Sequence, residues 1–236
     1  PWMASALGAW LDLPSSLLLG LIVMSAMPTT LSSGIVVSGV AGGQASWALM
    51  FTMGLSLLGI FTVPCMLSLL IQDHNVMASP WPLLYKLICM VLIPFLVGAI
   101  IRRWVDLSQF KLIFSYLPST CVIYVVWLSL SASASLLLEM GGTTFCLALG
   151  AAVLIHVILL IWHYGLAKVL KLELAQTKTL TFIGAQKTLP IAISTLSALL
   201  GADMGLSLTI CLIFHFSQLL IDSSLAGFWS QASEHK

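Results

Sequence analysis

The sequence is poor in charged residues. Only 7% of its 236 residues are Asp, Glu, Lys or Arg, whereas about one quarter of the residues of a soluble domain are charged. Apolar residues make up 60% of the chain, and its mean hydropathy is +1.09. This composition excludes an ordinary soluble domain. It predicts an all-α integral membrane protein whose surrounding partner is the lipid bilayer.

The chain also lacks the features that several other classes of protein require. Its nine Lys and Arg residues are scattered and its net charge is +1, which excludes a nucleic-acid partner. The five cysteines stand singly in apolar segments, so neither a disulfide framework nor a metal site is expected. The absence of an HExxH motif, of paired catalytic aspartates and of a Ser/His arrangement argues against an enzyme.

The beginning of the chain shows no targeting signal. Pro1 is followed by no basic n-region and no small-residue cleavage site, so no signal peptide is predicted. We expect the chain to be a fragment of a longer protein.

Seven apolar segments each contain the roughly 20 residues that cross a bilayer. They are Ser15–Val40, Ser46–Ile71, Leu83–Ile101, Leu112–Ser135, Thr144–Ala167, Leu180–Leu200 and Leu206–Phe228. The links between them alternate in charge, because Lys and Arg gather at residues 102–111 and 168–179. Basic links remain on the cytoplasmic side or its equivalent in an organelle, so these two links and the C-terminal tail are predicted to lie there.

Two of the segments are interrupted in the same way. The first contains AMPTTLSSG (residues 26–34) and the sixth contains GAQKTLP (residues 184–190). A proline removes a backbone donor and clashes with the preceding helical turn, so both helices should unwind near Pro28 and Pro190. Unwound backbone in a membrane must be buried in protein or line a wet cavity. Paired broken segments predict the binding site of a transporter, at the point where the two breaks meet.

The order of the segments indicates an internal repeat. Three unbroken segments, the broken segment and one more segment make a five-helix repeat at residues 81–236, and residues 1–72 then form the end of an earlier repeat. An odd number of helices inverts the second copy, so a full-length protein of ten spans with its N-terminus inside is expected. The 236-residue chain alone should expose an apolar flank and should not transport.

Three stretches carry a family resemblance: MPTTLSSGIVVSGVAGGQASWALMFTMG, IGAQKTLPIAIS and FHFSQLLIDSSLAGFW. They resemble the bile acid:sodium symporter superfamily. The closest likeness is to its branch of sodium/bile acid cotransporter 7 type and plastid sodium/metabolite cotransporter-like proteins. The resemblance implies that this chain corresponds to helices four to ten of a fold with a panel and a core domain. It also implies two broken helices that cross at mid-membrane, and alternating access.

The resemblance also implies positions for sodium ligands. Ser33, Thr52 and Gln186 match ligand positions of sodium-coupled members. Gly34 stands where an asparagine is usual, Phe182 replaces the acidic ligand, and Lys187 replaces another asparagine. The loss of an acid and the gain of a cation argue against sodium coupling at the usual sites, and sodium and a proton remain the possible coupling ions.

Lys187 is the unusual charge of the sixth segment. It lies about 13 Å deep if the path from Lys178 is helical, where a bare ammonium needs a partner, a wet cavity or the loss of its proton. Asp222 is the best-placed carboxylate, and it shares one helix face with His215 and Gln218 through i, i+3, i+7 spacing. The hypothesis is that Lys187 takes the place of bound sodium and that Asp222 balances its charge.

These residues also allow purely structural interpretations. Lys187 could be a snorkelling lysine or part of a structural ion pair, and Asp222 could face the cytoplasm at a helix end. The hydroxyl residues of the first break could serve helix packing, and His215 could be a satisfied buried histidine. His156 and His163 are interpreted as packing or interfacial residues.

The sequence as a whole predicts a secondary active transporter of a small organic anion, because the N-termini of half-helices and Lys187 favour negative charge. The predicted substrate and ion site comprises Thr29, Thr30, Ser32, Ser33, Thr52, Gln186, Lys187, Thr188, His215, Gln218 and Asp222. The alternative is a non-transporting regulator or scaffold of ion homeostasis that retains the fold. A plastid envelope and a plasma membrane fit equally well, and the sequence predicts no oligomeric state.

Overall fold

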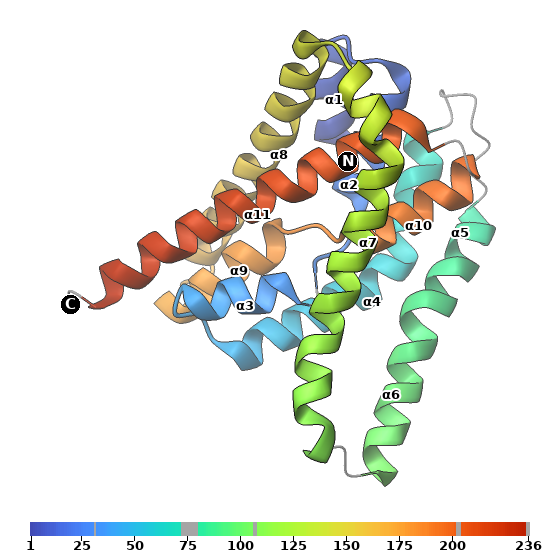
Figure 1. The fold of residues 1–236 in the computed structure, drawn as a ribbon. Helices are drawn as coiled ribbons and strands as arrows, with labels where there is room; N and C mark the ends of the chain where they lie inside the picture. The colour runs from blue at the N-terminus through green and yellow to red at the C-terminus, as the bar shows by residue number, and fades with distance from the viewer. Residues whose placement is uncertain (31, 72–79, 106–107, 202–203, 235–236) are drawn as a thin grey trace.

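The structure is all-helical in the part of the chain that it describes. The computed structural model describes residues 1–30, 32–71, 80–105, 108–201 and 204–234 (Figure 1). The α-helices are α1 (Trp2–Trp10), α2 (Ser15–Ala26), α3 (Ser33–Val40), α4 (Ala45–Leu70), α5 (Pro80–Leu87), α6 (Ile93–Trp104), α7 (Lys111–Glu139), α8 (Gly142–Val169), α9 (Leu174–Ala185), α10 (Leu189–Leu200) and α11 (Gly205–Glu234). A π-helix, η2 (Ile88–Leu92), joins α5 to α6, and a 3₁₀ turn, η3 (Ser108–Phe110), precedes α7.

The helices have the lengths that a multi-pass membrane protein requires. Among the described residues, five stretches are long and apolar enough to cross a bilayer: Ala45–Leu70, Pro80–Trp104, Gly142–Val169, Leu174–Leu200 and Gly205–Gln231. They correspond to five of the seven predicted segments. The fourth predicted segment is α7, and the first is divided into the short helices α2 and α3. The sequence analysis did not predict α1.

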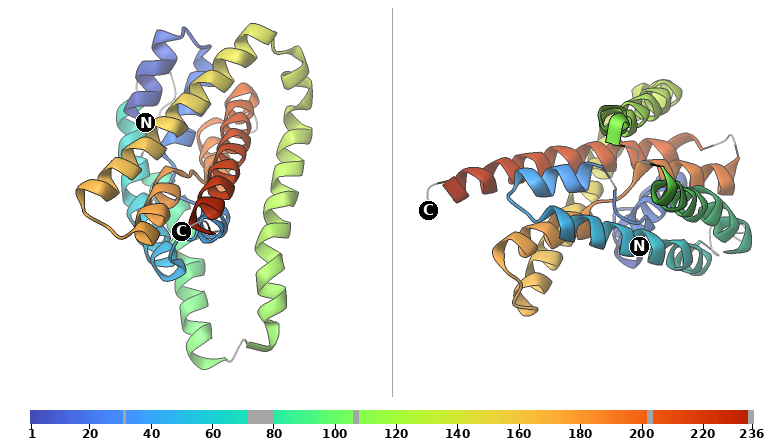
Figure 2. Two further views of the ribbon diagram at one scale, coloured as in Figure 1. Left: turned by 90° about the vertical axis from the view of Figure 1, so that its left-hand side faces the viewer. Right: turned by 90° about the horizontal axis from the view of Figure 1, so that it is seen from below.

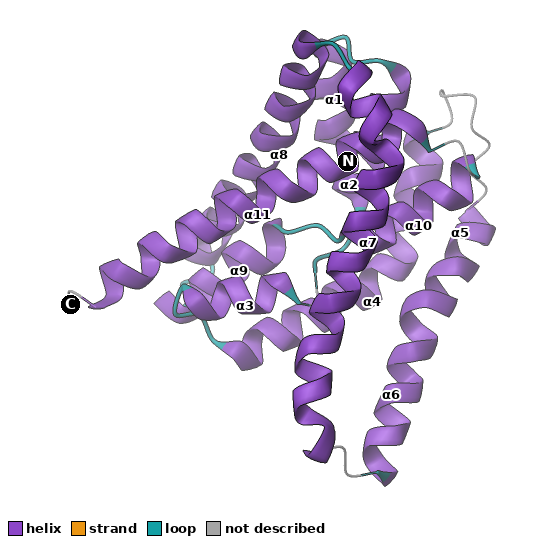
Figure 3. Cartoon of the chain, in the orientation of Figure 1, coloured by secondary structure: helices purple, strands orange, loops and turns teal. Residues whose placement is uncertain are grey.

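Both predicted helix breaks are present, and they meet. The chain leaves α2 in an extended conformation at Met27 and resumes as α3 at Ser33, while the second break lies between Ala185 and Leu189. The backbone N–H of Thr188 donates a 3.0 Å hydrogen bond to the carbonyl oxygen of Pro28. The two connecting loops therefore lie against each other in the middle of the structure (Figure 3).

The two prolines act differently at these breaks. Pro28 lies within the unwound stretch, whereas Pro190 lies in the first turn of α10. The first turn of a helix tolerates proline because its backbone N–H has no partner there. The second break consequently precedes Pro190.

Helix α11 is the central element of the fold. It packs against α2, α3, α7, α8 and α10, and runs diagonally across the body of the molecule (Figures 1 and 2). Its contact with α2 is close. Ser207 donates a 2.6 Å hydrogen bond to the carbonyl oxygen of Ser16, and the Cys211 Sγ lies 3.3 Å from the carbonyl oxygen of Gly20. Large apolar side chains such as Ile22 and Phe214 fill the rest of this core.

Helices α6 and α7 extend beyond this body, away from the other helices (Figure 1). Many of their apolar side chains are exposed, among them Ile100 and Trp104 on α6 and Tyr116 and Trp127 on α7. The outer face of α4 is also apolar, with Leu58 and Phe61 exposed. Exposed apolar faces of this kind are expected where a helix faces hydrocarbon.

Gly20 should be essential for the packing of α2 on α11. A Cβ at this position would collide with the backbone oxygen of Ser207, which cannot move as the tip of a side chain can. Gly20→Ala should therefore cost about 1–3 kcal/mol of stability, as overpacking does. The measurement is thermal unfolding of the purified protein in detergent.

Gly54→Ala is the matched control, because a Cβ at Gly54, within α4, would meet nothing within 4 Å. It should be neutral or slightly stabilising, since alanine favours helix more than glycine does. Equal melting temperatures for the two variants would show that the contact between α2 and α11 is loose.

Candidate substrate and ion site

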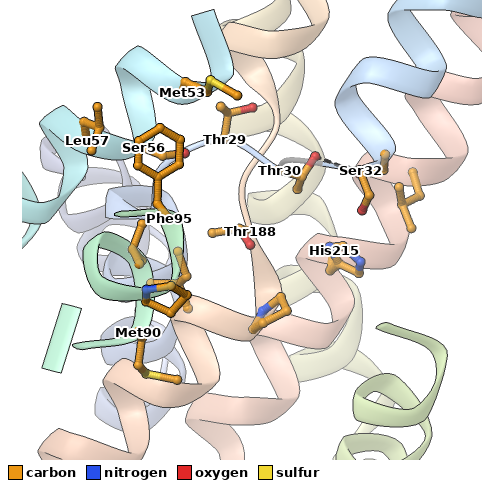
Figure 4. Close-up of a pocket in the computed structure, with 16 residues that line it drawn as sticks. Thr29, Thr30, Ser32, Met53, Ser56, Leu57, Met90, Phe95, Thr188 and His215 are labelled. Atoms are coloured by element: carbon orange, nitrogen blue, oxygen red, sulfur yellow. Dashed lines mark hydrogen bonds between the residues drawn. The ribbon is translucent and has the colours of Figure 1, made fainter. Parts of the chain in front are cut away.

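A cavity of about 470 Å³ lies beside the meeting point of the two breaks (Figure 4). One part of its lining is polar and comes from the breaks and α11, and the other part is mostly apolar and comes from α4, η2, α6, α10 and α11. The polar lining residues are Thr29, Thr30, Ser32, Ser33, Thr188 and His215, joined by Ser56 of α4. Met53, Leu57, Phe95 and Ile191 are among the apolar residues. The cavity therefore offers different surroundings to the two ends of a ligand.

Two helix N-termini border this cavity. Ser32 is the N-cap residue of α3 and Thr188 is the N-cap residue of α10, and neither side chain caps its own helix. The first backbone N–H groups of a helix carry partial positive charge and favour an anion. The hydroxyl of Thr29 is buried and has no hydrogen-bond partner in the described part of the chain. These groups together form a set of donors that is suited to a negatively charged group.

A chain of hydrogen bonds connects the first break to the second. The hydroxyl oxygens of Thr30 and Ser33 lie 2.7 Å from each other. They lie 2.6 Å and 3.1 Å, respectively, from Oε1 of Gln186. The Nε2 of Gln186 donates a 2.7 Å hydrogen bond to Oδ2 of Asp222 on α11. Gln186 is fully buried, so its orientation is set by the hydroxyls on one side and the carboxylate on the other.

Asp222 has a second partner, on α8. The Nε2 of His156 lies 2.7 Å from Oδ1 of Asp222, and both side chains are fully buried. His156 is therefore a buried residue of the core and not an interfacial one, and its polar partner was not predicted from the sequence. The other ring nitrogen, Nδ1, is buried without a partner among the described residues. The ring also packs edge-on against Phe214, with the ring centroids 6.2 Å apart.

Gln218 holds the backbone of the second break. Its Oε1 accepts a 3.0 Å hydrogen bond from the N–H of Lys187, and its Nε2 donates a 2.8 Å bond to the carbonyl oxygen of the same residue. The Nε2 also lies 3.1 Å from Nδ1 of His215. The stripe His215, Gln218 and Asp222 is buried, as its spacing predicts. Through Gln218, this stripe supplies hydrogen-bond partners to the backbone N–H and C=O of Lys187, which have no partners within a helix.

The side chain of Lys187 does not form the expected pair with Asp222. Within the described residues its ammonium forms neither an ion pair nor a hydrogen bond, and both oxygens of Asp222 are bonded to other groups. On α8, His163 packs against Gly184, next to the break.

Two positions inferred from the family resemblance have different surroundings. Phe182, in the place of the acidic ligand, is fully buried in an apolar cluster and packs against Trp229 with the ring centroids 5.3 Å apart. Thr52 is fully buried on α4 next to the cavity residue Met53, and its hydroxyl has no partner among the described residues.

Lys178 lies inside a helix and not in the basic link that was predicted for residues 168–179. It lies within α9 and is buried, and its ammonium donates hydrogen bonds to the carbonyl oxygens of Ala41 (2.6 Å) and Trp229 (3.3 Å). The first of these carbonyls is at the C-terminus of α3, where a cation is favourable. Lys178 therefore stabilises the half-helix that follows the first break.

Helices that are broken at a shared polar site inside a bilayer are typical of secondary transporters. Residues 2–231 match the model of the SBF-like CPA transporter family, and the chain belongs to this family, within the bile acid:sodium symporter superfamily. It is therefore a membrane-embedded transporter-family protein rather than an enzyme. The resemblance drawn from the sequence motifs is confirmed.

Curated relatives include "Probable sodium/metabolite cotransporter BASS4, chloroplastic" of Arabidopsis thaliana, which is 33% identical over 233 residues, covering 92% of this chain and 53% of the relative. The protein of the same name from Oryza sativa subsp. japonica is 31% identical over 242 residues, covering 94% of this chain and 56% of the relative. "Sodium/bile acid cotransporter 7" of Xenopus tropicalis is 27% identical over 218 residues, covering 89% of this chain and 63% of the relative. The chain thus spans between about half and two thirds of the length of these relatives.

The apolar cluster around Phe182 should reject a restored acid. Phe182→Glu places a carboxylate in this apolar cluster. The ammonium of Lys178, one helical turn earlier on α9, already donates to two carbonyl oxygens. We expect a loss of several kcal/mol of stability, the cost of burying an unpaired charge, and Phe182→Leu should cost less. Thermal unfolding of both variants in sodium chloride and in choline chloride is the measurement. A Phe182→Glu protein of wild-type stability, further stabilised by sodium, would contradict this prediction.

Proposed function

We propose that the full-length protein is a secondary active transporter that moves a small organic anion by alternating access. The observation that carries the proposal is a single cavity bordered by the N-termini of two half-helices and lined by their hydroxyl side chains. The family supports it, because its curated relatives are named as cotransporters. These names give no support to the alternative of a non-transporting regulator.

The proposal includes the architecture of the whole protein. Ten helices in two inverted five-helix repeats would place residues 1–72 at the end of the first repeat and residues 81–236 in the second. The basic links and the C-terminal tail would then lie on the cytoplasmic or equivalent side. The chloroplastic name of the BASS4 relatives favours a plastid membrane over the plasma membrane.

The cavity favours a substrate with one anionic group and an apolar part. Among the described residues, no Lys or Arg lines it, so the charge of the substrate would meet hydroxyls, backbone N–H groups and helix dipoles. Such neutral donors suit a single carboxylate or sulfonate better than a multiply charged phosphate, which proteins usually bind with Arg or Lys. Met53, Leu57 and Phe95 then surround the apolar part.

Sodium at the usual sites is not part of this proposal. Phe182 removes the acid that would hold the ion, and Lys187 supplies a positive charge that remains in the protein. We propose that the ammonium of Lys187 takes the place of the sodium ion. Because Asp222 is bonded elsewhere, the charge of Lys187 is available to attract an anion to the crossing.

Filling the cavity should abolish transport. Ser56 lines the cavity from α4, and Ser56→Trp would occupy the space that a substrate needs. Thr62 lies on the exposed face of the same helix, so Thr62→Trp is the matched control. We expect the full-length protein in liposomes to take up at least one of a panel of labelled organic monoanions, and Ser56→Trp alone to lose this uptake. Uptake that survives in Ser56→Trp would place the substrate elsewhere.

Uptake should not require sodium. Replacing sodium by choline on both sides of the liposome membrane should leave the rate unchanged, and Lys187→Met should abolish uptake. Lys171→Met, at an exposed position outside the helices, controls for the general loss of a positive charge. A rate that rises steeply with sodium in the wild type and is unchanged in Lys187→Met would leave Lys187 as a structural charge.

A further inference from the structure

The pair formed by His156 and Asp222 is the most deeply buried set of titratable groups in contact within the described chain. Both side chains are completely inaccessible, and 2.7 Å separates Nε2 from Oδ1. Each oxygen of the carboxylate accepts one hydrogen bond from the protein, one from His156 and one from Gln186. Nδ1 of His156 has no hydrogen-bond partner among the residues that the structure describes. A purely structural pair would be expected to satisfy this nitrogen as well.

We propose that His156 and Asp222 form a proton-binding site that couples proton movement to transport of the anion. The coupling to transport rests on the function proposed above, whereas binding of the proton does not. The proton is held by His156, and Asp222 is the fixed negative charge that stabilises the imidazolium.

The geometry decides where the proton binds. Nε2 donates its hydrogen to the carboxylate, so Nδ1 is the nitrogen that gains and loses the proton. With a neutral imidazole the pair carries one negative charge, and with an imidazolium it is neutral. Charge buried in a low-dielectric region is costly, so the two states differ strongly in energy. The proton comes from water on one side of the membrane and returns to water on the other, and no covalent bond to carbon changes.

The hydrogen-bond chain connects this pair to the cavity. Thr30 lines the cavity and bonds to Gln186, which bonds in turn to Asp222. An anion in the cavity would repel the unprotonated pair, and protonation of His156 removes this repulsion. Anion and proton then increase each other's affinity by the same factor, as linkage requires. One proton and one monoanion would cross together without net charge.

The other titratable groups near the pair have different surroundings. On α11, His215 is next to Gln218, and on α9 the ammonium of Lys178 donates to two carbonyl oxygens. Lys187 follows α9 in the chain. His163 lies on α8 two turns beyond His156, packs against Gly184, and has its Nδ1 2.7 Å from the carbonyl oxygen of Leu159.

The remaining titratable groups belong to the ends of their elements. Helix α1, which also packs on α8, is preceded by the amine of Pro1 and followed by the carboxylate of Asp12. Helix α8 itself carries Cys146, Tyr164 and Lys168 toward its two ends. Among the described residues, Asp222 is therefore the carboxylate that contacts His156.

The test is nuclear magnetic resonance of the full-length protein with ¹⁵N-labelled histidine, in phosphatidylcholine nanodiscs and choline chloride. One signal, absent in His156→Gln, should change from the neutral to the protonated form of the imidazole as the pH is lowered from about 8 to 5. Asp222→Asn should move the midpoint of this change, because a charge in direct contact is removed. Lys187→Met should leave the titration in place. His156→Gln keeps an N–H donor for Asp222, and its thermal stability shows whether it is folded.

Three results would overturn the proposal. The His156 signal could stay in one protonation state over the whole range, or its midpoint could be the same in Asp222→Asn. The titration could also vanish in Lys187→Met, which would assign the proton to that residue. The measurement does not involve transport, so a failed uptake experiment with a titrating His156 refutes the transport function and leaves the proton site. Uptake without titration refutes the proton site alone.

Discussion

The unwound backbone at the meeting point of the two broken helices is the constraint on which the rest of the structure depends. Backbone N–H and C=O groups inside a bilayer must find partners in the protein, because hydrocarbon offers none. Here Thr188 bonds directly to Pro28, and the amide of Gln218 serves both polar groups of the Lys187 backbone. Helix α11 must therefore present a polar stripe at mid-membrane, although its other buried residues are mostly apolar.

The same constraint separates structural polar groups from those available to a ligand. Gln186, Gln218 and both oxygens of Asp222 have hydrogen-bond partners in the protein. In the described part of the chain, the buried polar atoms left without a partner are the hydroxyls of Thr29 and Thr52 and Nδ1 of His156. Thr29 lines the cavity, and His156 is joined to it through the hydrogen-bond chain. Unsatisfied polar atoms are costly, so their position next to the cavity agrees with a role in binding.

The sequence predicted the breaks well and the pairing of side chains poorly, for a physical reason. A proline beside polar residues changes the local backbone, so Pro28 and Pro190 were enough to locate both interruptions. The burial of the α11 stripe followed from helical spacing. The pairing of His156 with Asp222 joins residues 66 positions apart, and it depends on how α8 packs against α11. The only sequence signal for this pair was that a buried carboxylate such as Asp222 needs a partner. Lys187, which is nearer in sequence, was an equally reasonable candidate for that partner.

The polar contacts are distributed unevenly over the two sides of the cavity. The network at the breaks joins α3, α8, α9 and α11 through charged and amide side chains. The opposite wall of the cavity comes from α4, the π-helix and α6, and the described polar side-chain bond between α10 and the π-helix is a weak one, from Ser194 to the sulfur of Met90. The π-helix is followed by Pro94, which removes a further backbone bond. In the transport cycle proposed above, a change of access would disrupt the fewest of the described polar contacts if this wall moved and the two breaks stayed together.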